Sequence, residues 1–213
     1  MKGRFTGWSD AAFDVLLRLE GVPSTHVRAA VRNDRERLVR QPMVALLEEL
    51  ATVSSIFEDH SVSHFRTNPW WWQHQCAVAR LGRNIEISLR FDLDGLRIQG
   101  AWWYPDSCQV DSFRAAVADD VAGSQLQEII ENLEERGFGI EGDVMSRVPR
   151  GYPRNHPRAD LLRHRSVLAI EHLGCDEWLY TPTVIDRVLA ATDELYPLMS
   201  WLVDHVGSAS NSG

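Results

Sequence analysis

The sequence predicts an α+β domain: a mainly antiparallel β-sheet flanked by N-terminal, central and C-terminal helices. Apolar and polar residues alternate through residues 85–104, which is typical of antiparallel strands. Apolar residues recur at helical spacing both before and after that stretch. We expect residues 1–206 to form a single domain and residues 207–213 a flexible tail.

Three helices are expected before the sheet. Ser9 can cap the first helix, which ends at the Gly21-Val22-Pro23 break, and Ser24 can cap the second. Pro42 stands at the start of the third, whose apolar spacing ends near Phe57.

The sheet is predicted most clearly by a hairpin. Residues 85–91 alternate as one strand, Asp92-Leu93-Asp94-Gly95 forms a turn, and residues 96–104 alternate as the next strand. Neighbouring side chains of a strand point to opposite faces, so Trp102 is expected in the core and Trp103 on a wetter face. Further strands are expected over residues 61–66, 75–81, 138–146 and 166–173.

Two acidic helices and a long final helix complete the pattern. The first acidic helix begins near Asp106. Ser124 and Gln127 have the spacing of a capping box for the second, and Gly137 is placed to end it. Thr181-Pro182 opens the final helix.

Composition excludes several classes of protein. The net charge is -8, which argues against nucleic acid or an anionic membrane as a general partner. Cys76, Cys108 and Cys175 form no CxxC pair, which is typical of a reduced, cytoplasmic protein. No apolar run approaches the length of a membrane span, and the N-terminus lacks a signal-peptide pattern.

Residues 147–165, RVPRGYPRNHPRADLLRHR, are the most basic stretch of this acidic chain and are called the arginine segment below. Guanidinium groups bind phosphate or carboxylate in a planar, bidentate manner. The candidate ligand-binding residues of the segment are Arg147, Arg150, Tyr152, Arg154, His156 and Arg158. A short helix starting at Pro157 is also expected there.

An intramolecular alternative explains the same charges. Residues 106–146 hold ten acids and two arginines. A basic ribbon laid across these acidic helices would neutralise both without a ligand, and prolines would fix its path. The direction in which the guanidinium groups point decides between the two interpretations.

The eight tryptophans of the chain are a second unusual feature. Trp72 and Trp103, together with His64, are candidates for contact with a planar ligand, because indole rings stack on bases, sugars and peptides. The alternative is a second apolar layer beneath the N-terminal helices. At least one residue of the Trp70–Trp72 run is expected to be exposed or covered by a partner.

Metal and nucleotide motifs are weak. His60, His64, His74 and Cys76 resemble a ligand set, but the extended local sequence separates His60 from His64 too far for a shared zinc. Residues 137–142 match GxGxxG in the wrong context, with a helix before them rather than a strand. No GxSxG or P-loop is present, so we assign no catalytic residue, metal or cofactor.

The arginine segment, extended to Ala169 as RVPRGYPRNHPRADLLRHRSVLA, resembles the bacterial and fungal family catalogued as domain of unknown function 2461. FTGW at residues 5–8, AWWYPD at 101–106 and PLMSWL at 197–202 add to the resemblance, which covers nearly the whole chain. It implies a fold and a family, but no reaction.

The chain departs from the family pattern at two places. In SVSHFRTNPWWW, His64, Pro69 and Trp72 replace the arginine, lysine and tyrosine of the family signature. The Asn-Arg-x-Trp-Phe pattern expected after the first helix is missing at residues 23–30. These departures imply a divergent member with altered or absent activity.

Three functions stay open. The first is a binding protein for an anionic or planar ligand, or for a protein partner, through the arginine segment and nearby tryptophans. The second is a hydrolase-like enzyme for a phosphate-bearing or other anionic substrate, with His64 or His156 as general base. The third is a structural protein that self-associates through exposed tryptophans.

Overall fold

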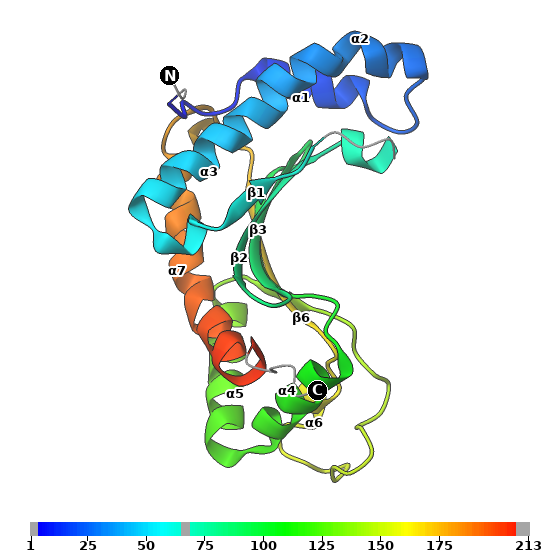
Figure 1. The fold of residues 1–213 in the computed structure, drawn as a ribbon, viewed down its shortest axis with the longest axis vertical. Helices are drawn as coiled ribbons and strands as arrows, with labels where there is room; N and C mark the ends of the chain where they lie inside the picture. The colour runs from blue at the N-terminus through cyan, green and yellow to red at the C-terminus, as the bar shows by residue number, and fades with distance from the viewer. Residues whose placement is uncertain (1–3, 65–68, 208–213) are drawn as a thin grey trace. The chain divides into compact units, whose positions relative to one another are not determined.

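The structure, a computed structural model, describes residues 4–64 and 69–207. Six strands form one antiparallel sheet with helices on both sides (Figure 1), which confirms the predicted α+β class. The strand order is β1-β2-β3-β4-β6-β5. The strands are β1 (His60–Val62), β2 (Gln75–Gly82), β3 (Ile85–Asp92), β4 (Gly95–Trp102), β5 (Gly139–Glu141) and β6 (Val167–Gly174).

The helices differ widely in length. The α-helices are α1 (Asp10–Arg18), α2 (Thr25–Arg35), α3 (Gln41–Val53), α4 (Ser107–Ala118), α5 (Asp120–Glu135), α6 (Ala159–Leu162) and α7 (Val184–Leu202). Shorter turns of 3₁₀ or π geometry are η1 (Glu36–Arg40), η2 (Ser55–Phe57), η3 (Pro69–Trp72), η4 (Glu177–Tyr180) and η5 (Val203–Gly207). No helix in the described part of the chain is long and apolar enough to cross a membrane.

The chain forms two compact units. The first comprises the chain up to Ala79 with Ser88–Ile98 and His172–Ala191. The second comprises Arg80–Ile87, Gln99–Glu171 and the chain from Thr192 onward.

The first unit is organised around Trp8. Its ring stacks on Phe91 with centroids 4.5 Å apart, and its Nε1 donates to the carbonyl oxygen of Val39 at 3.2 Å. The Ser24 hydroxyl accepts from the amide of Val27, which confirms Ser24 as the cap of α2. Pro42 lies in the first turn of α3, as predicted, directly after the π-helical turn η1.

The second unit buries Trp102, as predicted, with Phe113 and Trp201 around it. Asp106 caps α4, and its side chain and that of Gln109 form a reciprocal capping box.

The start predicted for the second acidic helix is wrong, because the helix begins five residues earlier. The carboxylate of Asp119 accepts from the amides of Val121 and Ala122, so α5 starts at Asp120 and Ser124 already lies inside it. These hydrogen bonds also lower the pKa of Asp119. Gly137, with φ of 95°, follows the last turn as predicted.

The wetter face predicted for the second hairpin strand is only partly correct, because Arg97 and Trp103 are half-buried but Gln99 is buried. β3 alternates between buried and half-buried residues, as predicted, but β4 is buried along almost its whole length. On the face predicted to be wetter, Ala101 is buried in a cluster with Leu168 and Ile170 of β6, and Trp103 packs against this cluster. Gln99, expected on the wetter face, is buried too.

The other predicted elements agree with the structure to different degrees. β2 and β6 match their predicted ranges closely, whereas β5 covers only three residues of the 138–146 range. β1 covers His60–Val62 of the strand expected at 61–66, and residues 65–66 lie outside the described residues. α6 begins at Ala159 rather than Pro157.

Candidate functional site

The arginine segment belongs to the second unit, and Arg158 anchors it. The guanidinium of Arg158 donates from Nε to the carbonyl oxygen of Val117 at 2.7 Å and from Nη2 to that of Asp119 at 3.0 Å. Only 7% of the residue is exposed. The last turn of α4 ends in unsatisfied carbonyl groups, which favour a cation at this position. The guanidinium of Arg158 is therefore bound by carbonyl oxygens of the protein itself.

Two further arginines of the segment are paired internally. Arg163 binds Asp160 at 3.0 Å and donates from Nε to the carbonyl oxygen of Met145 at 2.6 Å. Arg165 lies 2.7 Å from Asp143 Oδ2. Arg165 thus pairs with an acid of the stretch 106–146, and Arg158 also lies 3.3 Å from Asp120 of α5, whereas the partner of Arg163 belongs to the segment itself.

The first half differs. Arg147, Arg150 and Arg154 are exposed, and none of them has a carboxylate partner among the described residues. They line one hollow of about 850 Å³ together with Tyr152. Arg163 and its partner Asp160 complete the charged lining. We call this hollow the arginine hollow; four arginines and one acid surround it, so it favours anions.

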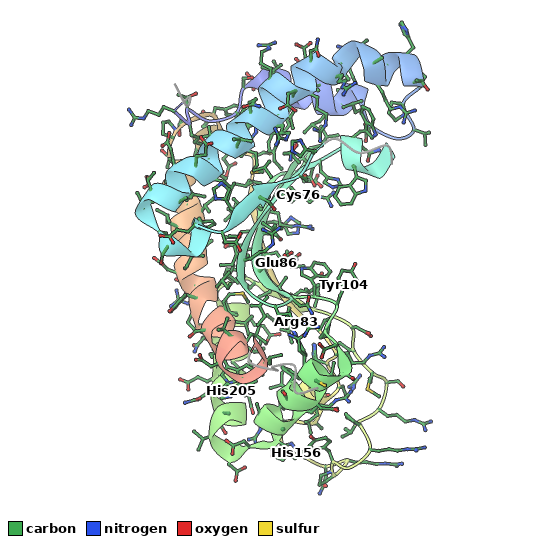
Figure 2. All side chains as sticks on the ribbon, in the orientation of Figure 1. Cys76, Arg83, Glu86, Tyr104, His156 and His205 are labelled. Carbon is green, nitrogen blue, oxygen red and sulfur yellow. The ribbon has the colours of Figure 1, made fainter. Side chains whose placement is uncertain are left out.

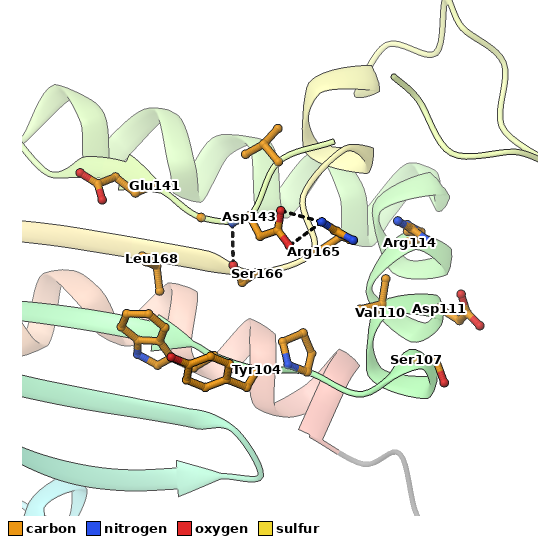
Figure 3. A pocket seen from close by; sticks show the side chains of 14 residues that line it. Tyr104, Ser107, Val110, Asp111, Arg114, Glu141, Asp143, Arg165, Ser166 and Leu168 are labelled. Carbon is orange, nitrogen blue, oxygen red and sulfur yellow. Dashed lines mark hydrogen bonds and ion pairs between the residues drawn. The ribbon is translucent and has the colours of Figure 1, made fainter. Parts of the chain in front are cut away.

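A second hollow, of about 940 Å³, lies between other parts of the same unit (Figure 3). We call it the aromatic hollow, because the rings of Trp103 and Tyr104 stack in its wall with centroids 5.9 Å apart. Tyr104 is 88% exposed and has a φ of 45°, which is unusual outside glycine (Figure 2). Sequence reasoning proposed Trp103 as a ligand contact but missed Tyr104.

Arg114 lines the aromatic hollow from α4. Its Nη2 donates to the sulfur of Met145 at 3.1 Å, and its buried Nε has no hydrogen-bond partner among the residues that the structure describes. A thioether is a weak acceptor, so this guanidinium keeps most of its donor capacity. Sequence reasoning missed Arg114 as a site residue, although it is one of only two arginines in the acidic stretch 106–146.

The remaining predicted residues lie elsewhere. His156 accepts from the amide of Arg158 through Nδ1 at 3.1 Å and does not line the arginine hollow. Trp72 is in the first unit, 9% exposed, with the guanidinium of Arg28 over its ring. His64 is exposed and lines a smaller hollow of about 360 Å³ with Arg32 and Arg40. The site residues are therefore divided between the two units.

The tryptophan turn η3 is held by a residue that the sequence did not single out. Arg35 is buried, and its guanidinium donates to the carbonyl oxygens of Trp71, Trp72 and His74. Burial lowers the pKa of Arg35 to about 10. Trp71 is 36% exposed, in agreement with the expectation that at least one residue of the run is exposed, whereas the side chain of Trp70 is outside the described residues.

The part of the chain that the structure describes contains no group of three or more His, Cys, Asp or Glu side chains placed to hold a metal ion. The residues that match GxGxxG follow helix α5 and include the short strand β5. This is the helix-before-strand order on which the sequence interpretation rejected a dinucleotide site.

Comparison with known proteins gives one match. Residues 60–201 match the model of a family described as "Conserved hypothetical protein (DUF2461)". No curated protein and no solved structure matches the chain.

Proposed function

The chain belongs to the DUF2461 family of conserved hypothetical proteins, and we propose that this member binds a multiply charged anion, such as a diphosphate group, in the arginine hollow. The observation that carries the proposal is that the arginines of the segment fall into two groups. Arg158, Arg163 and Arg165 are held by the protein's own oxygen atoms, whereas Arg147, Arg150 and Arg154 surround one hollow without such partners among the described residues.

The charge of the lining supports an anion that carries more than one negative charge. Four guanidinium groups face a single carboxylate, that of Asp160, which Arg163 already binds. Like charges gathered on one surface repel each other, and an oxyanion that bridges two or three guanidinium groups relieves that repulsion. Phosphate groups accept bidentate hydrogen bonds from arginine, which favours them over halide-like anions.

The backbone of the segment supports a preformed site. Pro149 and Pro153 flank Arg150 and Tyr152, and proline restricts the conformations that a free loop would otherwise sample. Arg158 holds the C-terminal side of this loop against the end of α4. A loop that is already restricted loses less conformational entropy when it binds a ligand.

Isothermal titration calorimetry with pyrophosphate tests the proposal. The double variant Arg150→Gln/Arg154→Gln removes two charges from the hollow. The matched control Arg83→Gln/Arg136→Gln removes two charges from exposed ion pairs, with Asp106 and Glu194, in the same unit. We expect the first variant to raise Kd by about tenfold or more and the control to change it less than about threefold.

Salt dependence adds a second readout, because screening of exposed charges weakens binding as ionic strength rises. Equal losses in both double variants would show that only the net charge matters, and the proposal would be wrong. Absence of pyrophosphate binding to the wild-type chain at about 10 mM would also contradict it.

An enzymatic function is the second candidate, because His64 shares its hollow with Arg32 and Arg40. A histidine beside guanidinium groups could act as a general base on an anionic substrate while arginine stabilises the developing charge. Glu36 pairs with Arg40 at 2.9 Å and leaves Arg32 as the other cation of the lining. Hydrolysis of p-nitrophenyl phosphate that is lost in His64→Gln but kept in His26→Gln would support this function, and equal rates would exclude it.

A further inference from the structure

We infer that the aromatic hollow is a second binding site and that it takes a small, singly charged aromatic carboxylate. The aromatic ring would lie against Trp103 and Tyr104, and the carboxylate would accept hydrogen bonds from Arg114. This inference does not depend on anion binding in the arginine hollow.

The aromatic wall is held in place before any ligand arrives. Trp103 packs against the buried cluster of Ala101, Leu168 and Ile170. Asn84, in the turn between β2 and β3, fixes the same stretch, since its carbonyl oxygen accepts from the amide of Trp103 at 2.9 Å and its side chain donates to the carbonyl oxygen of Tyr104 at 3.3 Å. A planar ligand therefore meets an ordered stacking surface.

Arg114 supplies the unmet hydrogen-bond donors. Arg114 lines the hollow, and the acceptor that its Nη2 meets among the described residues is the sulfur of Met145. A thioether is a weak acceptor, and a carboxylate in the hollow would offer the guanidinium stronger, charge-assisted hydrogen bonds. This poorly matched donor points to a ligand that brings acceptor oxygen atoms.

Arg165, the other arginine of the lining, is not available in the same way. Its Nη2 lies 2.9 Å from Oδ1 and 2.7 Å from Oδ2 of Asp143 (Figure 3). Its amide also donates to the carbonyl oxygen of Asp143 at 2.7 Å. The pair is fixed through both side chain and backbone, which leaves Arg114 as the anchoring cation.

The charge of the lining sets the charge of the ligand. Arg114 and Arg165 face three acids, Asp111, Glu141 and Asp143, in the aromatic hollow. A second negative charge on the ligand would meet carboxylates rather than free guanidinium groups. The hollow thus favours one carboxylate on an apolar, planar body, in contrast to the arginine-rich lining of the other hollow.

The test is isothermal titration calorimetry of the full chain with indole-3-acetate, which has the carboxylate, and with tryptamine, which carries an amine instead. We expect indole-3-acetate to bind and tryptamine not to bind at about 10 mM. Arg114→Gln and Tyr104→Gly should each raise Kd by about tenfold, whereas the control Arg136→Gln, an exposed arginine of the same unit, should not. Because the ring of Tyr104 is exposed, we expect Tyr104→Gly to fold, so it tests the site even if Arg114→Gln does not fold.

The inference would be overturned if indole-3-acetate did not bind the wild-type chain, or if its affinity were unchanged in both Arg114→Gln and Tyr104→Gly. Tighter binding of tryptamine than of indole-3-acetate would also overturn it. Saturating pyrophosphate provides a separate check, since it should leave the affinity for indole-3-acetate within about threefold. Direct displacement would show that the two ligands share one site and would overturn the assignment of a second one.

Discussion

The Nε atom of Arg158 lies 2.7 Å from the carbonyl oxygen of Val117, at the last turn of α4. This contact joins the arginine segment to α4 across 41 residues of sequence, and further hydrogen bonds to Asp119 and Ser124 complete the attachment. A buried guanidinium with several acceptors determines where the segment runs.

Replacement of Arg158 should therefore destabilise the protein. Arg158→Leu removes the guanidinium that donates to the carbonyl oxygen of Val117 and leaves that of Asp119 with only the amide of Gly123 as a donor among the described residues. We expect a loss of about 2–4 kcal/mol in the free energy of unfolding. Urea denaturation followed by circular dichroism measures it. The exposed Arg154→Leu is the control and should change stability by less than about 0.5 kcal/mol. Equal effects would show that Arg158 is not an anchor.

Gly123→Ala should be destabilising for a related reason. A Cβ atom at Gly123 would lie 2.2 Å from the carbonyl oxygen of Val117 and 2.4 Å from Nε of Arg158, so α5 or the guanidinium must move. We expect a loss of about 1–3 kcal/mol, although alanine is the better helix former. Gly139→Ala, where the nearest atom is 3.9 Å away, is the control for the same thermal or urea denaturation. A stabilised Gly123→Ala protein would contradict the close approach.

Tyr104→Gly should stabilise the chain, in contrast to most substitutions. Tyr104 has a positive φ, which costs a residue with a Cβ about 1 kcal/mol, and its ring is largely exposed. We expect a gain of about 0.5–1 kcal/mol, less the loss of stacking on Trp103. Tyr104→Ala removes the ring but keeps the strain, so it should not stabilise. The melting temperatures of the two variants decide the matter.

Stability should fall as the pH is lowered from about 6.5 to about 4. Burial lowers the pKa of His74 from 6.5 to about 4, so in this range the unfolded chain binds a proton that the folded chain does not. The free energy of unfolding therefore rises with pH in this window and reaches its full value above pH 6.5. Burial also lowers the pKa of His164, which acts in the same direction.

The contribution of His74 can be isolated with His74→Gln. We expect its removal to reduce the loss of stability between pH 7 and pH 4 by about 1–2 kcal/mol, a figure that allows for partial solvent access. Urea denaturation at several pH values measures this difference, with the exposed His26→Gln as the control. An unchanged pH dependence in His74→Gln would show that this histidine is not responsible.

Local patterns predicted the fold well where one physical cause dominated. The alternation in β3, the serine cap of α2, Pro42 in α3 and Gly137 after α5 each reflect a rule that acts over a few residues. The start of α5 was predicted wrongly because both Asp119 and Ser124 have side chains that can cap a helix. In the structure Asp119 is the cap and Ser124 lies inside the helix. The second face of β4 was mispredicted because its burial depends on β6, which follows it by more than 60 residues.

The candidate site shows the same division. The concentration of charge indicated the arginine segment, and it was compatible both with a ligand and with internal pairing. Only the structure separates Arg158, which is buried, from Arg150 and Arg154, which are not. Arg114 and Tyr104 were missed because a lone arginine in a helix and a tyrosine at the end of a strand carry no local signal.

Met145 stands at the boundary of the two hollows. Its carbonyl oxygen accepts from Arg163 of one lining, and its sulfur accepts from Arg114 of the other. Conversion of that sulfur to a sulfoxide would replace a weak acceptor with a strong one and would compete with any ligand for Arg114. Oxidation of this single atom would thus occupy Arg114 in the aromatic hollow. The hydrogen bond from Arg163 to the carbonyl oxygen of Met145, beside the arginine hollow, would remain.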